Sequence, residues 1–350
     1  MLPLDGQQHG SFHPVLRYHG DQAVEPGMLD FAVNVRLAEP PRWLQDRLTA
    51  RLTDLASYPT KVDEERARNA VAARHHRRPD DVLLLSGAAE GFALLANLGS
   101  KHAAVVQPSF TEPEHVLREA GVRVSPVVCD EGFGLELTSI PTDADLFVVG
   151  NPTNPTSVLH PRETILTARA PGRVVVVDEA FADAEADEPE SLARHACDDV
   201  IVLRSLTKTW ALAGLRCGYL LASPELVKRL ESRRPHWPLG TLQLEAIYQC
   251  SQPGAVAEAA AKAADMRADR DHFINQLTEL GLRVTEPARA PFLLVSVPRA
   301  EEVRDRLARD HRIAVRRCDT FPSLGPDYLR LAVRTRPDID RLISVLRELL

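Results

Sequence analysis

The sequence is poor in cysteine, and the cysteines it has are scattered. Five occur in 350 residues, and no two of them form a CxxC pair. Structural zinc sites need clustered ligands and disulfide frameworks need a regular set of cysteines. We therefore expect neither, predict no metal site, and expect a reducing, cytoplasmic compartment.

Long hydrophobic runs are also missing. No stretch approaches the roughly 18 consecutive apolar residues of a membrane span. The opening MLPLDGQQHGSFHPVL lacks the basic start and apolar centre of a signal peptide. A formal net charge of −7 argues against nucleic acid or an anionic membrane as the main partner. The expected partner is a small molecule.

The middle of the chain alternates short β-branched segments with helical ones. Strands are expected at 82–86, 103–107, 122–128, 146–149, 174–177 and 200–203, with helices such as 90–96 and 112–119 between them. This alternation predicts an α/β fold with a mostly parallel sheet covered on both faces. Because 350 residues exceed the usual size of one core, we expect two domains. The predicted large domain covers residues 30–240, and a smaller α+β domain combines 1–29 with 241–350.

The most informative segment is LRSLTKTWALAGLRCGYL, at 203–220. Lys208 lies there between a hydroxyl-rich turn and an apolar stretch. A nucleophilic lysine needs a lowered pKa, which burial and nearby cations provide. Ser205, Thr207 and Arg216 are residue types that bind a phosphate dianion. The apolar surroundings argue against an ordinary solvated lysine.

The run SLTKTWALAGLRCGY resembles the cofactor-lysine signature of fold-type I pyridoxal-phosphate aminotransferases, in the branch of histidinol-phosphate aminotransferase and threonine-phosphate decarboxylase. The resemblance covers nearly the whole chain. It implies the fold-type I architecture, with a seven-stranded-type sheet in the large domain. It also implies pyridoxal 5′-phosphate as cofactor, with Lys208 as the catalytic residue that holds it as a Schiff base. Ser205, Thr207 and Arg216 would bind its phosphate.

Further motifs extend the implied cofactor site. VVVVDEA ends a hydrophobic strand at Asp178, on the sheet edge where α/β folds bind ligands. By the resemblance, Asp178 keeps the pyridine nitrogen protonated, so that the ring acts as an electron sink. GNPTNPT resembles the family loop in which Asn154 donates to the phenolic oxygen. LLSGAAE matches the phosphate-binding turn, with Ala88 and Ala89 at a helix start. Phe110 occupies the position that stacks on the ring.

A subunit contact is implied by SYP, in which Tyr58 matches a tyrosine that reaches the cofactor phosphate of the partner subunit. This analogy implies a homodimer. The match rests on a dipeptide, Tyr-Pro, and therefore on the family resemblance alone.

On the substrate side, Arg330 lies in the alternating strand YLRLAVR, opposite to its leucine neighbours. The resemblance implies that Arg330 binds the α-carboxylate of the substrate bidentately. Arg316 or Arg317 would bind a distal phosphate, and Arg316 is preferred. Arg334 is expected to be solvated. The other candidates for the substrate phosphate are His9 and Arg36.

The details favour the decarboxylase side of the family. His9-Gly10, LDFAVNV, DEAF and PESL resemble its segments. Four positions depart from the family pattern, namely Phe181 for tyrosine, Ser157 for glycine, and Arg36 and Gly240 for asparagine. We predict a threonine-phosphate decarboxylase-like enzyme of cobalamin biosynthesis that acts on a phosphorylated amino acid. The alternative is a histidinol-phosphate-type aminotransferase of histidine biosynthesis, and a remote one is a non-catalytic protein that binds pyridoxal phosphate.

Overall fold

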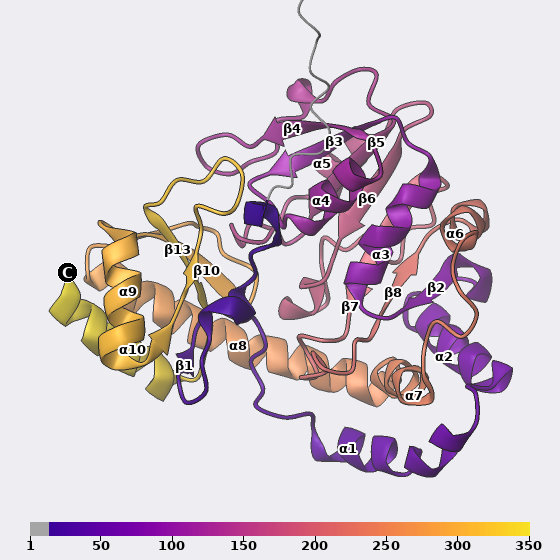
Figure 1. Ribbon diagram of the computed structural model, residues 1–350, viewed down its shortest axis with the longest axis horizontal. Coiled ribbons are helices and arrows are strands. Elements are labelled where there is room, and N and C mark those ends of the chain that lie inside the picture. The colour runs from indigo at the N-terminus through magenta and orange to yellow at the C-terminus, as the bar shows by residue number, and fades with distance from the viewer. Residues whose placement is uncertain (1–13) are drawn as a thin grey trace, which may run out of the picture.

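A computed structural model describes residues 14–350. Its main feature is a seven-stranded sheet in the order β2-β8-β7-β6-β5-β3-β4 (Figure 1). The strands are β2 (Val82–Leu85), β3 (His102–Gln107), β4 (Arg123–Val128), β5 (Leu146–Gly150), β6 (Val174–Asp178), β7 (Val200–Ser205) and β8 (Gly218–Leu221). β8 runs antiparallel to both of its neighbours, and the other pairs are parallel.

The six strands expected from the sequence are all present, within one or two residues at each end. The sequence analysis did not identify β8, a four-residue strand that follows directly on the lysine segment. Its insertion between β2 and β7 makes the sheet mixed. The α/β fold class and the fold-type I architecture are confirmed.

Helices cover both faces of the sheet because the buried strands are apolar on both sides. Val175 and Val177 of β6 pack on one face with Leu44, Ile165 and Leu244 from α1 (Arg42–Thr49), α5 (Arg162–Thr167) and α7 (Thr241–Cys250). α2 (Lys61–Arg74) packs on the same face. The other face packs against α3 (Ala88–Leu94), α4 (Glu112–Glu119) and α6 (Pro224–Glu231). This arrangement leaves the ends of the strands open for a site.

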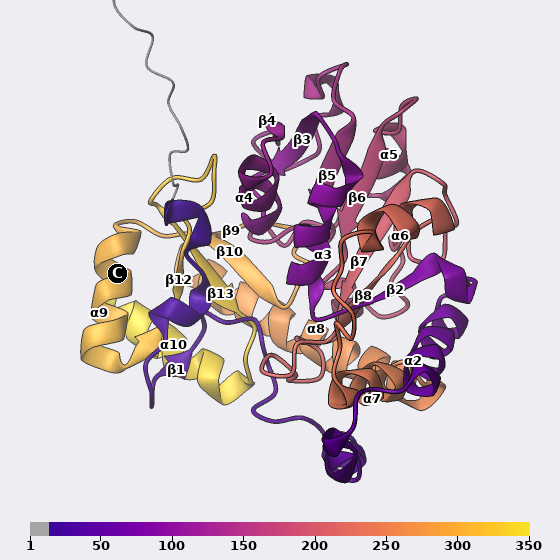
Figure 2. The same cartoon turned by 45° about the vertical axis from the view of Figure 1, so that its right-hand side comes forward.

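The C-terminal part builds a four-stranded antiparallel sheet in the order β12-β13-β10-β9. Its strands are β9 (Arg283–Val284), β10 (Phe292–Ser296), β12 (Arg316–Arg317) and β13 (Tyr328–Ala332), accompanied by helices α8 (Pro253–Glu279), α9 (Ala300–His311) and α10 (Arg336–Leu349). β1 (Leu29–Asp30) pairs with β11 (Ile313–Ala314), so the N-terminal segment does return to the C-terminal part (Figure 2). The residue boundaries of the two domains remain a prediction.

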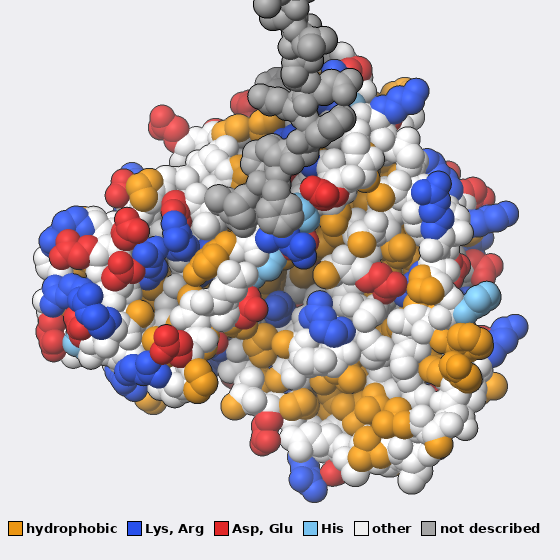
Figure 3. All heavy atoms as spheres, in the orientation of Figure 1, with side chains coloured by type: hydrophobic (Ala, Val, Ile, Leu, Met, Phe, Trp, Pro, Cys, Tyr) orange, Lys and Arg blue, Asp and Glu red, His pale blue; other side chains and the backbone are white. Residues whose placement is uncertain are grey.

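Within residues 14–350, no helix has the length and apolar character to cross a bilayer. The same part of the chain contains no group of three or more side chains that could hold a metal ion. Acidic and basic side chains are interspersed on the face in Figure 3, most visibly over α9 and α10. That face therefore carries no extended area of one charge sign.

Candidate active site

A cavity of about 430 Å³ opens where the carboxyl ends of the large-sheet strands meet the small sheet. Residues from β6, β7, the turn before α3, β13 and the N-terminal segment all line it. Of the residues singled out from the sequence, it brings together Ala88, Ala89, Phe110, Asn154, Asp178, Ser205, Thr207, Lys208, Arg216, Arg316 and Arg330. Their roles remain predictions, but the structure places them around one space.

One end of the cavity has the features of a phosphate cradle. Gly87 has a φ of +80°, and α3 begins directly after it with Ala88 and Ala89. The first backbone N–H groups of a helix have no acceptor within it, so those of Ala88 and Ala89 suit an anion. A Cβ on Gly87 would lie 2.9 Å from Nη2 of Arg216, which shows how closely the guanidinium approaches this turn. The positive φ favours glycine at position 87, and a side chain there would displace the Arg216 guanidinium.

Two further groups hold this cradle in place. Gln243 donates to the Ser86 hydroxyl at 3.0 Å and to the Arg216 carbonyl at 2.8 Å, while its own oxygen accepts from the backbone N–H of Gly240. Gly218 of β8 lets the strand pass the turn, since a Cβ there would lie 2.7 Å from the Arg204 carbonyl oxygen and 3.2 Å from the Ala88 nitrogen. Neither Gln243 nor Gly218 was singled out from the sequence.

Asp178 faces the cavity from the end of β6, and Lys208 faces it from the turn that follows β7. Burial, with Arg330 and Arg216 adding to it, lowers the pKa of Lys208 to about 8. Burial raises the pKa of Asp178 to about 6, although the Ala180 N–H partly offsets this. At neutral pH the carboxylate is therefore mostly ionised, and a useful fraction of the amine is neutral. This is what an imine-forming lysine and a partner for a pyridinium nitrogen require.

Arg330 and Asn154 connect the two sides of the cavity. Nη1 of Arg330 donates to Oδ1 of Asn154 at 2.7 Å, and Nη2 donates to the Ala32 carbonyl at 2.5 Å. The first bond fixes the amide so that its NH₂ group is left for a ligand oxygen. Burial and the neighbouring Arg316 lower the pKa of Arg330 to about 9, so it remains a cation at neutral pH. Its buried Nε has no hydrogen-bond partner among residues 14–350.

The structure distinguishes the two adjacent arginines of β12. Arg316 is buried, lines the cavity and donates to the Tyr18 carbonyl at 2.8 Å. Arg317 lies on the other side of the strand in an ion pair with Asp319 and does not line the cavity. The position of Arg316 is the one that the sequence analysis preferred.

Two other candidates, Arg36 and Tyr58, do not line the cavity of this chain. Arg36 forms an ion pair with Asp269 on α8, and its role in substrate binding stays a prediction. Tyr58 is 73% exposed and stacks on Trp237 with ring centroids 4.4 Å apart. His9 lies outside the described residues. The subunit role of Tyr58 therefore stays a prediction.

The structure also corrects the expectation for Arg334, which is buried. Its guanidinium donates to the carbonyls of Asp30, Val33 and Val35. These bonds shape the segment after β1, which lines the cavity with Ala32, Val33 and Asn34. Arg336, two residues further on, is largely exposed.

The N-terminal segment contributes residues that were missed. His19 lines the cavity, pairs with Glu112 at 2.7 Å, and has its ring 5.5 Å from that of Phe110. Gly20 permits a close approach, because a Cβ there would lie 2.4 Å from the Ala32 carbonyl oxygen. Asn34 presents a buried Oδ1 with no partner in the described part of the chain. A second His-Gly pair, ten residues after His9-Gly10, was the available signal for His19 and Gly20.

Two departures from the family pattern have visible consequences. Phe181 packs edge-on against Phe292, with centroids 5.0 Å apart, and Arg330 lies over the same Phe292 ring. Ser157 adopts a φ of +66°, and its hydroxyl accepts from the N–H groups of Arg289 and Ala290. The serine thus connects the Asn154 loop to the segment before β10.

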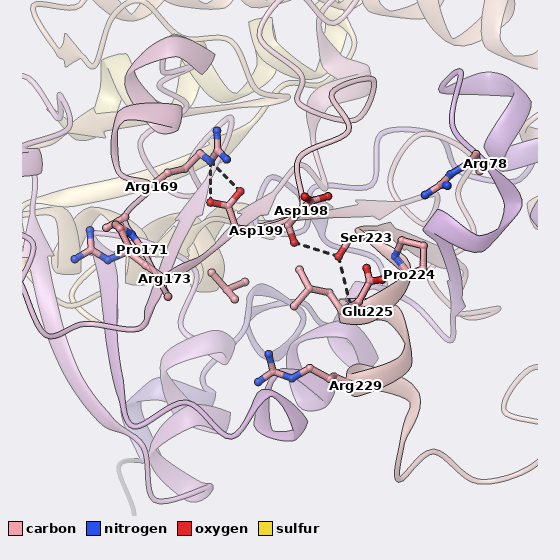
Figure 4. A pocket seen from close by; sticks show the side chains of 14 residues that line it. Arg78, Arg169, Pro171, Arg173, Asp198, Asp199, Ser223, Pro224, Glu225 and Arg229 are labelled. Carbon is pink, nitrogen blue, oxygen red and sulfur yellow. Dashed lines mark hydrogen bonds and ion pairs between the residues drawn. The ribbon is translucent and has the colours of Figure 1, made fainter.

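A larger hollow of about 910 Å³ lies at the amino ends of the strands (Figure 4). Its arginines are already engaged. Arg169 pairs with Asp199, and Arg173 donates to the carbonyls of Pro141, Ala144 and Ala168. Its Ser223 caps α6 and donates to the Asp198 carbonyl. Arg78 and Arg229 are engaged as well, with Asp81 and with the Leu98 carbonyl, so the arginines of this hollow differ from those of the cavity around Lys208.

Comparison with known proteins agrees with this geometry. Residues 26–346 match the family model described as aminotransferase class I and II. A histidinol-phosphate aminotransferase of Mycobacterium tuberculosis is 54% identical, covering 95% of this chain and 90% of the relative. A threonine-phosphate decarboxylase of Salmonella typhimurium is 29% identical, with coverages of 92% and 91%. The structure of Sinorhizobium meliloti histidinol-phosphate aminotransferase with pyridoxal-5′-phosphate superposes with a TM-score of 0.83 at 19% identity, covering 98% and 99%.

The lowered pKa of Lys208 leads to a prediction for the apoprotein. Only the neutral amine attacks an aldehyde, so the rate of covalent pyridoxal-phosphate uptake should rise with pH and level off above about 8. An ordinary lysine amine has a pKa near 10.4. Stopped-flow absorbance from pH 6 to 10 measures the profile, with Lys208→Ala as the control for other amines. A rate that keeps rising through pH 10 would contradict the burial argument.

The close approach at Gly218 leads to a second prediction. Gly218→Ala should displace the Ala88 amide and weaken pyridoxal-phosphate binding about tenfold, because overpacking typically costs ~1–3 kcal/mol. Equilibrium titration of the apoprotein measures the dissociation constant. Gly214→Ala, in the same segment but with nothing within 4 Å of the added Cβ, is the matched control. Equal affinities for the two variants would show that β8 does not set the turn.

Proposed function

Because this chain belongs to the class I and II aminotransferase family, we propose that it transfers an amino group from a phosphorylated donor of the histidinol-phosphate type to a 2-oxo acid. Its cofactor is pyridoxal 5′-phosphate. The 54% identity to a histidinol-phosphate aminotransferase favours this function over the threonine-phosphate decarboxylase that the motifs first suggested, since the decarboxylase relative is 29% identical.

The observation that supports an anionic substrate most strongly is the pair of buried arginines, Arg330 and Arg316. Each donates to uncharged oxygens, and neither forms an ion pair with a carboxylate among residues 14–350. A buried charge without a counter-charge is costly. Both guanidiniums line the cavity, so a ligand with anionic groups would neutralise them. A phosphorylated amine and a dicarboxylic 2-oxo acid both meet this need.

The residues that line the cavity have separate roles in the proposed reaction. The bound cofactor supplies an electron sink that stabilises negative charge developing at the substrate Cα. Arg330 orients the substrate through its anionic group, and Arg316 holds the second anion. Lys208 would serve as the base that takes up and returns the Cα proton. Asp178 keeps the positive charge on the ring nitrogen, and Asn154 donates from its amide NH₂.

Phe181 supports no hydrogen bond at the position where the family pattern has a tyrosine. Loss of such a donor costs a net ~1 kcal/mol and leaves the contact to Asn154. Phe181 packs on Phe292, and the Phe292 ring lies beneath Arg330. Phe181 thus helps to hold Arg330, the proposed substrate-binding arginine, in place.

The proposed reaction is tested with two substrates. Purified enzyme loaded with pyridoxal phosphate is mixed with histidinol phosphate and 2-oxoglutarate, and glutamate is measured. The same enzyme is mixed with O-phosphothreonine, and CO₂ is measured. We expect glutamate from the first mixture, with turnover reduced at least ~100-fold by Arg330→Met, because removing a buried charged partner costs ~3 kcal/mol or more. CO₂ without glutamate would replace this proposal with the decarboxylase.

We also propose that the active unit is a homodimer. Four exposed hydrophobic side chains lie between residues 52 and 62, and a fifth lies in the loop after α6. We name these five residues the hydrophobic patch: Leu52, Leu55, Tyr58, Val62 and Trp237. Hydrophobic side chains gather at the lower right of Figure 3, over the region of α2 and α7 in Figure 1. Grouped exposed apolar side chains are typical of a protein interface. A second copy of the chain is the occupant that the Tyr58 match implies.

The proposed homodimer leads to a prediction for the hydrophobic patch. Leu55→Glu should shift the sedimenting species from twice the 38.7 kDa chain mass towards one chain, because a buried charge opposes association. Val128→Glu, on an exposed hydrophobic residue of β4 outside the patch, is the matched control. A monomeric wild-type protein with full activity would rule out the dimer and the subunit role of Tyr58.

A further inference from the structure

A buried charged cluster lies directly behind the cofactor site. Arg204 of β7 has a side chain only 2% exposed and is surrounded by three carboxylates. Its guanidinium donates to Glu179 at 3.1 Å, to Glu188 at 2.5 and 2.7 Å, and to Asp183. Arg74 of α2 adds a second cation, which donates to Asp183 and Glu188. None of the five charged residues lines the cavity.

This cluster is adjacent in sequence to two residues that line the cavity, Asp178 and Ser205. Glu179 directly follows Asp178, and Arg204 directly precedes Ser205. Asp183 belongs to the short helix Ala182–Ala184 that follows β6. The strand ends that carry the cavity residues are thus anchored on the side away from the cavity.

One bond extends this anchoring to the lysine itself. The hydroxyl of Thr209, the residue after Lys208, donates to Oδ2 of Asp183 at 3.1 Å. The other oxygen of Asp183 accepts from Arg74 at 2.8 Å and from Arg204. Asp183 therefore connects the lysine segment to the segment that follows Asp178, and both of its oxygens are engaged. The Asp183 side chain is only 6% exposed, so water competes little for these bonds.

We propose that Thr209 and Asp183 are positioning residues for the cofactor lysine. Their hydrogen bond sets the distance between the Lys208 segment and the strand end that carries Asp178. A lysine bound to one end of a flat ring and a carboxylate bound to the other must be held at a fixed separation. Hydrogen bonds to a charged, buried acceptor are stronger and more directional than neutral ones, which suits this task. The inference rests on the cofactor and does not depend on which substrate is turned over.

The experiment removes the hydroxyl of Thr209 and keeps its shape. In Thr209→Val, we expect the dissociation constant for pyridoxal phosphate to rise about fivefold, because the loss of one hydrogen bond costs a net ~1 kcal/mol. We also expect a displaced midpoint in the pH titration of the visible absorbance of the lysine-bound cofactor. Thr209→Ser keeps the hydroxyl and should restore both values. Affinity is measured by quenching of tryptophan fluorescence, since Trp210 is the next residue.

A second hydroxyl of the same network provides the matched control. Ser191 donates to Glu179 at 2.6 Å but is remote in sequence from Lys208. Ser191→Ala should lower the melting temperature and leave both cofactor readouts unchanged. If Thr209→Val behaves like Ser191→Ala, the bond is structural only and the proposal fails. Should Thr209→Val not fold, Thr209→Ala is compared with Thr209→Ser, and unchanged readouts overturn the proposal in the same way.

Discussion

The cavity depends on the convergence of several cations at the ends of the sheet strands, with few carboxylates beside them. Lys208, Arg330, Arg316 and Arg216 converge there, and Asp178 is a carboxylate that faces them. Burial, and after it repulsion from Arg330 and Arg216, lowers the pKa of the lysine, which keeps part of it neutral and reactive. The same excess of positive charge attracts a phosphate and the anionic groups of a substrate. Reactivity and ligand preference therefore have one electrostatic origin.

The protein stabilises this arrangement by neutralising charge elsewhere. Behind the sheet edge, Arg204 and Arg74 are matched by three carboxylates, so the strand ends are rigid without adding anions to the cavity. On the small-sheet side, Arg334 is satisfied by three carbonyls of the segment after β1. Arg334 also pairs with the Asp30 carboxylate at 3.3 Å, whereas the arginines that face the cavity form no ion pair with a carboxylate among residues 14–350. That difference marks which arginines are available to a ligand.

Much of the fold and most of the cavity could be predicted from the sequence, for identifiable reasons. Apolar strands such as 174–178 are recognisable because they are buried on both faces, and Asp178 is conspicuous at the end of one. Arg316 and Arg330 could be assigned to one side of their strands because side chains alternate. The ion pair of Arg36 could not be predicted, since its partner Asp269 lies on a distant helix. Gly218 and Gly20 were missed because their role is to let backbones approach, which depends on three-dimensional contacts.

The position of β8 in the sheet affects the order in which the chain folds. β8 supplies both the partner of β2 and the partner of β7, so it is the strand that joins the first strand of the sheet to the rest. Until residues 218–221 have emerged and paired, the edges of β2 and β7 stay open, although the parallel core from β3 to β7 is already available. Contacts between such distant segments slow the search for the native topology. The phosphate turn borders β8, so it takes shape only when this last strand is inserted, and competence to take up the cofactor marks completion of the sheet.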